Sequence, residues 1–192
     1  SVKQIDYLRY KAELLRRMFG GKVSIGFEDT RLGDRVHKMC YVDKSNPYFR
    51  VLRSFMYPEG KKRFTHKVLD MLSPHGIAIW YMDDGAAGVN RNKAGWVTSC
   101  YTNISTHCTE AEADIICDYF RDAHAIEFRK GYEKERYIVR ANTAASQKFA
   151  RLVEPYIIPS MRYKLAHVAN LHFHECRTTK TSVEDIVRPA AN

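Results

Sequence analysis

The spacing of apolar residues predicts the first elements of the chain. From Val2 to Phe19 apolar residues recur every three or four positions, as one face of a helix requires, and Gly20-Gly21 ends the pattern. Residues 22–29 and 36–43 alternate in part and predict two strands, with a turn at 30–34. A second helical pattern over 46–60 ends at Pro58 and Gly60, and a short helix leads to Leu72.

The pattern restarts at Ser73, which can cap a helix whose first residue is Pro74. The segment SPHGIAIWYMDDG predicts a helix that ends at Gly85. The Gly- and Asn-rich residues 86–95 predict a loop, and the alternation in 95–105 predicts a strand.

A capping-box pattern, Thr109 to Glu112, predicts the start of another helix. Residues 125–132 and 136–141 predict two strands with a turn at Glu133-Lys134. A last helix begins near Thr143 and leads into EPYIIPSMRYK.

A weak repeat relates the two halves at a lag of about 100 residues, because FRVLRSFMYPEGKK from Phe49 matches FARLVEPYIIPSMRYK from Phe149. We therefore expect an incomplete N-terminal repeat over 1–72, a C-terminal repeat over 73–166 and a tail over 167–192. The second repeat opens with the 73–85 helix, whereas nothing comparable precedes the Val2 helix.

Composition and charge limit the class of partner and the compartment that we expect. Lys and Arg number 31 against 22 Asp and Glu, a formal charge of +9 that favours a polyanionic partner, nucleic acid before a membrane surface. No apolar run approaches the ~20 residues of a membrane span. Five cysteines without a C-x-x-C pair are typical of reduced residues, so we expect an intracellular protein of the cytoplasm, the nucleoid or an organelle.

The stretch IAIWYMDDGA places Asp83 and Asp84 at the end of an apolar helix. Carboxylates at a helix C-terminus oppose the helix dipole. Two of them there call for a compensating cation, which favours a metal ion near Asp84 and a structural part for Asp83.

IAIWYMDDGA, the Ser- and Thr-rich strand that follows and YIIPSMRYKLAH together resemble the LAGLIDADG homing endonucleases, in particular the single-chain, two-repeat enzymes of mobile introns. The resemblance runs from about Val2 to Ala166. It implies an α+β fold of pseudo-twofold αββαββα repeats, with two antiparallel sheets forming a saddle for the DNA major groove. Two motif helices would meet at its centre.

The resemblance also implies a site. Asp84 matches the metal-binding carboxylate of the motif, so a metal centre is expected at Asp84 and Gly85, holding Mg²⁺ beside the scissile phosphate. Lys164 matches a basic catalytic residue of the second repeat, and Lys62, or its neighbour Lys61, the equivalent in the first. These lysines would position water and stabilise charge on the phosphate.

A first motif helix with its own acidic end is not found; Asp6 lies within the Val2 helix and no glycine follows it. The chain is then a fragment, one part of a split enzyme, or a relative that binds nucleic acid without cleaving it. We favour the first two, because removing a central helix would expose a large apolar seam. An upstream segment or a second chain would supply the missing helix.

Basic and amide side chains on the predicted strands are candidates for DNA contact. The DNA-binding candidates are Lys22, Arg31, Arg35, Lys38, Lys61, Asn103, Arg129, Lys130, Lys134, Arg136 and Arg140. Arg129, Arg140 and Asn103 are the candidates for reading base edges.

The cluster His167, His172, His174 and Cys176 invites a zinc interpretation, but no second ligand pair has structural-zinc spacing, so a surface tail is favoured. The leading hypothesis is a site-specific, metal-dependent DNA endonuclease cutting double-stranded DNA. The alternative is a cleavage-deficient relative, such as an intron-splicing maturase or another RNA- or DNA-binding scaffold. A third is a generic basic α/β nucleic-acid-binding domain.

Overall fold

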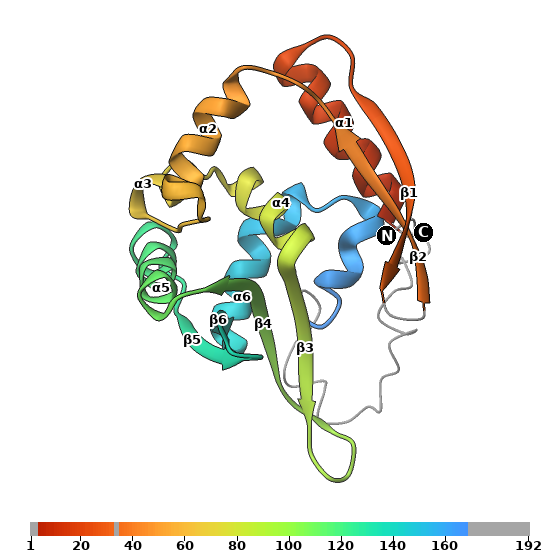
Figure 1. The fold of residues 1–192 in the computed structure, drawn as a ribbon. Helices are drawn as coiled ribbons and strands as arrows, with labels where there is room; N and C mark the ends of the chain where they lie inside the picture. The colour runs from red at the N-terminus through yellow and green to blue at the C-terminus, as the bar shows by residue number, and fades with distance from the viewer. Residues whose placement is uncertain (1–3, 33–34, 169–192) are drawn as a thin grey trace. The chain divides into compact units, whose positions relative to one another are not determined.

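A computed structural model describes residues 4–32 and 35–168, and the side chains of 30–40 are not described. The chain divides between Pro58 and Glu59 into two compact units. Their elements are labelled in Figure 1. This division precedes the boundary near residue 72 expected from the repeat.

The first unit contains helix α1 (Ile5–Phe19), strands β1 (Ser24–Leu32) and β2 (Arg35–Asp43), and helix α2 (Tyr48–Met56). The strands form an antiparallel hairpin from the pair Ser24–Asp43 to the pair Leu32–Arg35. The prediction of a turn over 30–34 is therefore wrong for residues 30–32, whose backbone continues the ladder.

Helix α2 has a strongly apolar face that stays exposed. None of its residues is buried, and Tyr48, Val51 and Phe55 are 52%, 49% and 38% exposed. Positions 48, 51 and 55 lie on one side of a helix. The start of α2 is anchored on Phe19 of α1, whose ring lies 5.0 Å from the Phe49 ring, edge-on, and 6.0 Å from the Tyr48 ring, centroid to centroid.

The second unit holds helices α3 (His66–Leu69), α4 (Pro74–Asp84), α5 (Glu110–His124) and α6 (Thr143–Val153), followed by 3₁₀ turns that reach Lys164. Its strands are β3 (Gly85–Arg91), β4 (Val97–Cys108), β5 (Phe128–Glu133) and β6 (Arg136–Ala141). They form one antiparallel sheet in the order β3-β4-β6-β5.

Strand β3 corrects the sequence prediction of a loop over 86–95. Glycine, alanine and asparagine have low strand propensity, yet Gly85 to Arg91 pairs along β4. Small residues are needed here: a side chain at Gly88 would meet the Tyr101 hydroxyl oxygen at 2.6 Å. The ring of Tyr101 therefore lies over Gly88 across the ladder, and only Asn92 to Trp96 forms the turn.

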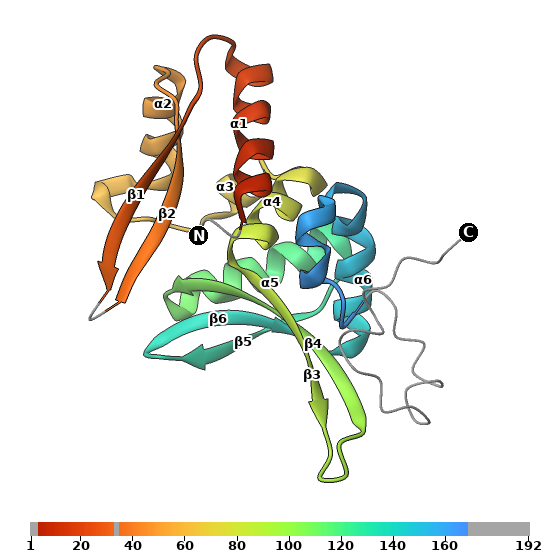
Figure 2. The ribbon, with the colours of Figure 1, turned by 90° about the vertical axis from the view of Figure 1, so that its right-hand side faces the viewer.

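Helices cover one face of this sheet, which we call the inner face (Figure 2). The β4 residues directed to it are buried, including Cys100, Thr102 and Ile104. Tyr81 of α4, Phe120 of α5 and Phe149 of α6 are fully buried, and the Tyr81 and Phe120 rings each pack edge-on against Phe149. The alternate residues of the strands form the outer face.

The capping box predicted at Thr109 is confirmed. The Thr109 hydroxyl accepts the Glu112 backbone N–H, and the Glu112 carboxylate accepts the Thr109 N–H at 2.9 Å. Glu112 also accepts the backbone N–H of Phe64 at 3.0 Å, which ties the segment before α3 to α5.

The repeat is visible in the order of elements: α1-β1-β2-α2 in the first unit and α5-β5-β6-α6 in the second. The predicted mixed fold of helices and antiparallel sheet is confirmed. In the second unit α6 packs against α4 and has buried residues, whereas α2 contacts Phe19 of α1 but has no buried residue of its own. No helix among the described residues is long and apolar enough to cross a membrane.

Candidate functional site

Helix α4 delivers two carboxylates to the start of the sheet. Ser73 caps its first turn by accepting the Gly76 N–H at 3.2 Å, with Pro74 in the first position. Ile77, Ala78, Tyr81 and Met82 are buried and fix the helix, whereas Asp83 and Asp84 at its end are exposed. The sequence prediction for this helix is confirmed. The Asp84 side chain is therefore exposed at the end of a helix that is held by buried residues.

Gly85 permits the abrupt change from helix to strand. A Cβ at this position would lie 1.9 Å from Cδ2 of Tyr81 and 2.5 Å from the Tyr81 carbonyl oxygen. The glycine is thus a steric requirement for the Tyr81 ring to pack beneath the chain. Its predicted place in a metal centre stays a prediction.

The Lys164 side chain caps the C-terminal end of α4. Its Nζ donates to the carbonyl oxygens of Met82 at 2.6 Å, Asp83 at 3.2 Å and Tyr81 at 3.4 Å. The Tyr81 hydroxyl donates in return to the Lys164 carbonyl at 2.7 Å. The last carbonyls of a helix lack partners and carry partial negative charge, so an ammonium group is well placed there.

Lys164 offsets part of the negative charge at this helix end. Burial lowers the pKa of Lys164, and the nearby Asp83 and Asp84 carboxylates oppose that shift. The Lys164 Nζ thus lies beside the two acids and donates to the last carbonyls of the helix. The two carboxylates need a metal ion less than the sequence indicated, because Lys164 supplies part of the compensating interaction at this helix end.

A metal would find two adjacent exposed carboxylates here, those of Asp83 and Asp84. Among the described residues, no group of three or more His, Cys, Asp or Glu side chains is arranged to hold a metal ion. Mg²⁺ commonly binds through one or two carboxylates together with waters and substrate phosphates. The exposed Asp84 fits one place in such a site, and the remaining ligands must come from elsewhere.

Lys62 lies apart from this pair. Its Nζ sits over the Phe64 ring, 4.9 Å from the centroid, and within the described part of the chain no hydrogen bond or ion pair joins it to Asp84 or Lys164. Lys61 is exposed beside it. The structure thus brings together Asp84 and Lys164 but not Lys62.

A polar row crosses the outer face of the sheet, starting next to the α4 end. Ala86 of β3 pairs with Asn103 of β4, Asn103 with Arg140 of β6, and Arg140 with Arg129 of β5. Directly paired residues share a face. Both arginines are exposed. The three candidates for base reading therefore lie in one line, which begins two residues beyond Asp84.

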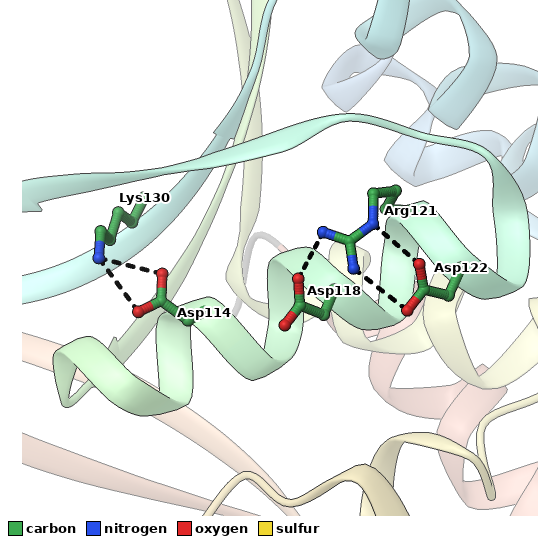
Figure 3. Close-up of polar contacts among 5 residues, drawn as sticks. All are labelled: Asp114, Asp118, Arg121, Asp122 and Lys130. Carbon is green, nitrogen blue, oxygen red and sulfur yellow. Dashed lines mark hydrogen bonds and ion pairs between the residues drawn. The ribbon is translucent and has the colours of Figure 1, made fainter.

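Lys130 does not belong to this row. It follows Arg129 directly and so points to the inner face, where its Nζ pairs with Glu110 at 2.8 Å and Asp114 at 3.0 Å on α5. Figure 3 shows the pair with Asp114 and, farther along α5, Arg121 between Asp118 and Asp122. These acids raise the pKa of Lys130. The structure separates Lys130 from the other candidates of the hairpin.

The remaining candidates are scattered. Lys134 lies in the β5–β6 turn, where residues 134 and 135 both have positive φ, one position later than predicted. Arg136 is exposed and lies opposite Glu133 in the ladder. Lys22 precedes β1 and is exposed; Arg31, Arg35 and Lys38 lie in the β1–β2 ladder, with side chains that are not described. His172, His174 and Cys176 lie outside the described residues.

Two neighbours of Arg140 went unnoticed in the sequence. Its guanidinium carbon lies 5.2 Å from the centre of the Tyr101 ring, and its Nη2 donates to Glu133 at 2.5 Å. Alternation along β4 already placed Tyr101 on the face of Asn103 and could have found the first. Nothing in the sequence pattern pointed to Glu133.

The comparison with protein families agrees with this geometry. The profile of the LAGLIDADG DNA endonuclease family matches residues 1–149. The chain belongs to the LAGLIDADG DNA endonuclease family. The resemblance inferred from the motif helix and the terminal segment is thereby confirmed.

Relatives of this LAGLIDADG chain include much longer proteins. It is 33% identical over 171 residues to Protein RecA of Mycolicibacterium flavescens, covering 86% of this chain but 38% of that protein. It is 26% identical over 98 residues to a probable intron-encoded DNA endonuclease of Mycosarcoma maydis, covering 51% of this chain and 67% of that protein. The chain thus spans well under half of its RecA relative.

A solved structure shares the fold. The homing endonuclease I-WcaI, bound to its DNA recognition sequence, superposes with a TM-score of 0.66 at 20% identity. The match covers 82% of this chain and 71% of that one. At this identity the likeness concerns the fold.

Proposed function

We propose that this LAGLIDADG chain forms the larger part of a site-specific endonuclease that makes a metal-dependent double-strand break in DNA. The observation that carries the proposal is the exposed Asp84 at the end of a buried helix, beside Lys164 and at the start of the polar row. An acid, a basic side chain and a candidate reading surface thus lie next to one another at the end of α4.

The metal proposed is Mg²⁺, as a divalent ion is general for endonucleases of this family. Asp84 would hold it, and when bound it would supply a polarised phosphate and an activated water. Lys164 keeps the end of α4, and with it Asp84, in a fixed position. Its ammonium would also stabilise negative charge on a phosphate bound near Asp84.

The outer face supplies the contact with DNA. A sheet ribbon can enter the major groove, where arginine recognises guanine and asparagine recognises adenine. Adjacent strands lie about 4.8 Å apart, so the row from Asn103 to Arg129 extends roughly 10 Å. That is about three base-pair steps of 3.4 Å. The phosphate contacts would come from Lys61, Lys134 and Arg136, and from Lys22, Arg31, Arg35 and Lys38 of the first unit. Lys130 is not among the proposed DNA contacts, because it pairs with the acids of α5.

A second acidic helix end is needed to complete the metal site. It would come from another segment or a second chain. The exposed apolar face of α2 supports this, because the equivalent helix α6 buries its apolar face partly against α4. A helix like α4 would cover the α2 face in the same way. The complete site would act on DNA in a nucleoid or organelle.

The test is a cleavage selection. The complete natural gene product is incubated with a random library of long duplexes in Mg²⁺ or in EDTA, and new ends are captured and sequenced. The proposal predicts ends within one sequence motif in Mg²⁺ alone. Sequence-specific retention of uncut duplex in both buffers would favour the cleavage-deficient alternative, and retention of structured RNA in its place would favour a splicing role.

A further inference from the structure

Arg140 is held from both sides on the outer face of the sheet. Its Nη2 donates to the Glu133 carboxylate of β5 at 2.5 Å, and its guanidinium lies over the Tyr101 ring of β4. Arg129, directly opposite on β5, makes no comparable pair of contacts among the described residues. Arg140 is therefore the arginine of the row with a defined orientation.

Glu133 is poorly explained by stability. The Arg140 and Glu133 side chains are 46% and 49% exposed, and exposed ion pairs contribute about 0–1 kcal/mol. A carboxylate on a face that meets DNA also repels phosphate. A charge that opposes binding and adds little stability calls for another role.

Holding an arginine in place has a clear benefit for recognition. A long side chain loses about 0.5–1.5 kcal/mol of conformational freedom when an interface immobilises it. A guanidinium already fixed by a carboxylate and an aromatic ring loses less. Its fork of donors is then presented in one plane, as bidentate contact with guanine requires.

We propose that Glu133, with Tyr101, is a positioning residue that orients Arg140 to read one guanine of the target. This inference rests on the proposed function. The base pair read by Arg140 would lie between those that face Asn103 and Arg129, since Arg140 lies between them in the row. Glu133 acts through Arg140 and sets sequence preference, with little effect on overall affinity.

The test compares four variants with the parent protein by binding selection on a random duplex library. Arg140→Gln should erase the guanine preference at one position, and Arg140→Lys, which can still donate to guanine, should weaken that preference while retaining non-specific affinity. Glu133→Gln should reduce that preference about 5- to 10-fold, part of the 1–3 kcal/mol of a bidentate contact. Glu135→Gln, in the turn that follows Glu133, is the matched control, because it removes the same charge without touching Arg140.

The outcomes separate the two claims. Both glutamine variants remove one negative charge and should raise non-specific affinity similarly. A loss of preference in Glu133→Gln but not in Glu135→Gln supports the inference. Equal preference in the parent and Glu133→Gln overturns it while the proposed function stands, whereas no duplex binding by the parent overturns both.

Discussion

At the scale of single residues, Lys164 explains how an acidic helix end is tolerated. Two carboxylates at the C-terminus of α4 oppose the helix dipole. Lys164 donates three hydrogen bonds to the last carbonyls of the helix. The Tyr81 hydroxyl donates to the backbone carbonyl of Lys164 and so fixes its position. These partners lie more than 80 residues apart in the chain, so no local pattern could have paired them.

Replacing Lys164 by methionine should destabilise the protein by about 2 kcal/mol, because a part-buried charge-assisted contact is lost while the apolar stem is kept. Chemical denaturation measures the change. Lys93→Met, in an exposed turn, is the control and should remain within about 0.5 kcal/mol of the parent. Equal stability of the two variants would show that Lys164 does not hold the helix end.

At the scale of elements, the transition from α4 to β3 depends on Gly85. The strand must begin immediately after the helix, with the Tyr81 ring directly beneath it. This close approach explains the glycine at position 85, and the Tyr101 ring explains the glycine at position 88. Asp84 is positioned by this transition, since it is the last residue of the helix.

Gly85→Ala should therefore cost about 1–3 kcal/mol, as overpacking in a tight site does. Gly131→Ala, in β5, is the matched control, since its Cβ would meet Ile138 at an ordinary 3.5 Å. Thermal unfolding of both variants gives the comparison. A Gly85→Ala protein as stable as the control would mean that the Tyr81 ring can move aside at the α4–β3 junction.

At the scale of the whole molecule, the positive charge supports the proposed binding of DNA. The chain carries +9, and the exposed arginines of the sheet gather on the face that the helices leave open. The acids of α5 lie on the helix-covered side, where they pair with Lys130 and Arg121. This separation of charge gives the sheet one face suited to a polyanion.

Duplex binding should weaken steeply with salt, since each phosphate neutralised adds about −0.9 to the slope of log K against log salt. Arg129→Gln should reduce that slope by up to about one if the residue neutralises a phosphate, and leave it unchanged if it reads a base. Fluorescence anisotropy across a salt series measures both. A flat response of the parent protein would argue against nucleic acid as the partner.

The sequence predicted the elements that have strong local signals. The caps at Ser73 and Thr109 and the Gly20 stop were confirmed. Strand β3 was missed because its small residues are selected by the Tyr81 and Tyr101 rings. The opposite faces of Arg129 and Lys130 were predictable, since neighbouring strand residues alternate. The contacts of Lys164 and Glu133 depend on tertiary structure and could not be predicted from the sequence pattern.

Cleavage by variants of the two adjacent acids tests the central claim most directly. In the complete natural gene product, with Mg²⁺ and the selected duplex, Asp84→Asn should abolish double-strand cleavage while duplex affinity stays within about threefold, a change of less than 1 kcal/mol. Asp83→Asn should keep cleavage, because the proposal gives Asp83 a structural part and not a metal-binding one. Undiminished cleavage by Asp84→Asn, or loss through Asp83→Asn alone, would contradict the assignment of Asp84 as the metal-binding carboxylate.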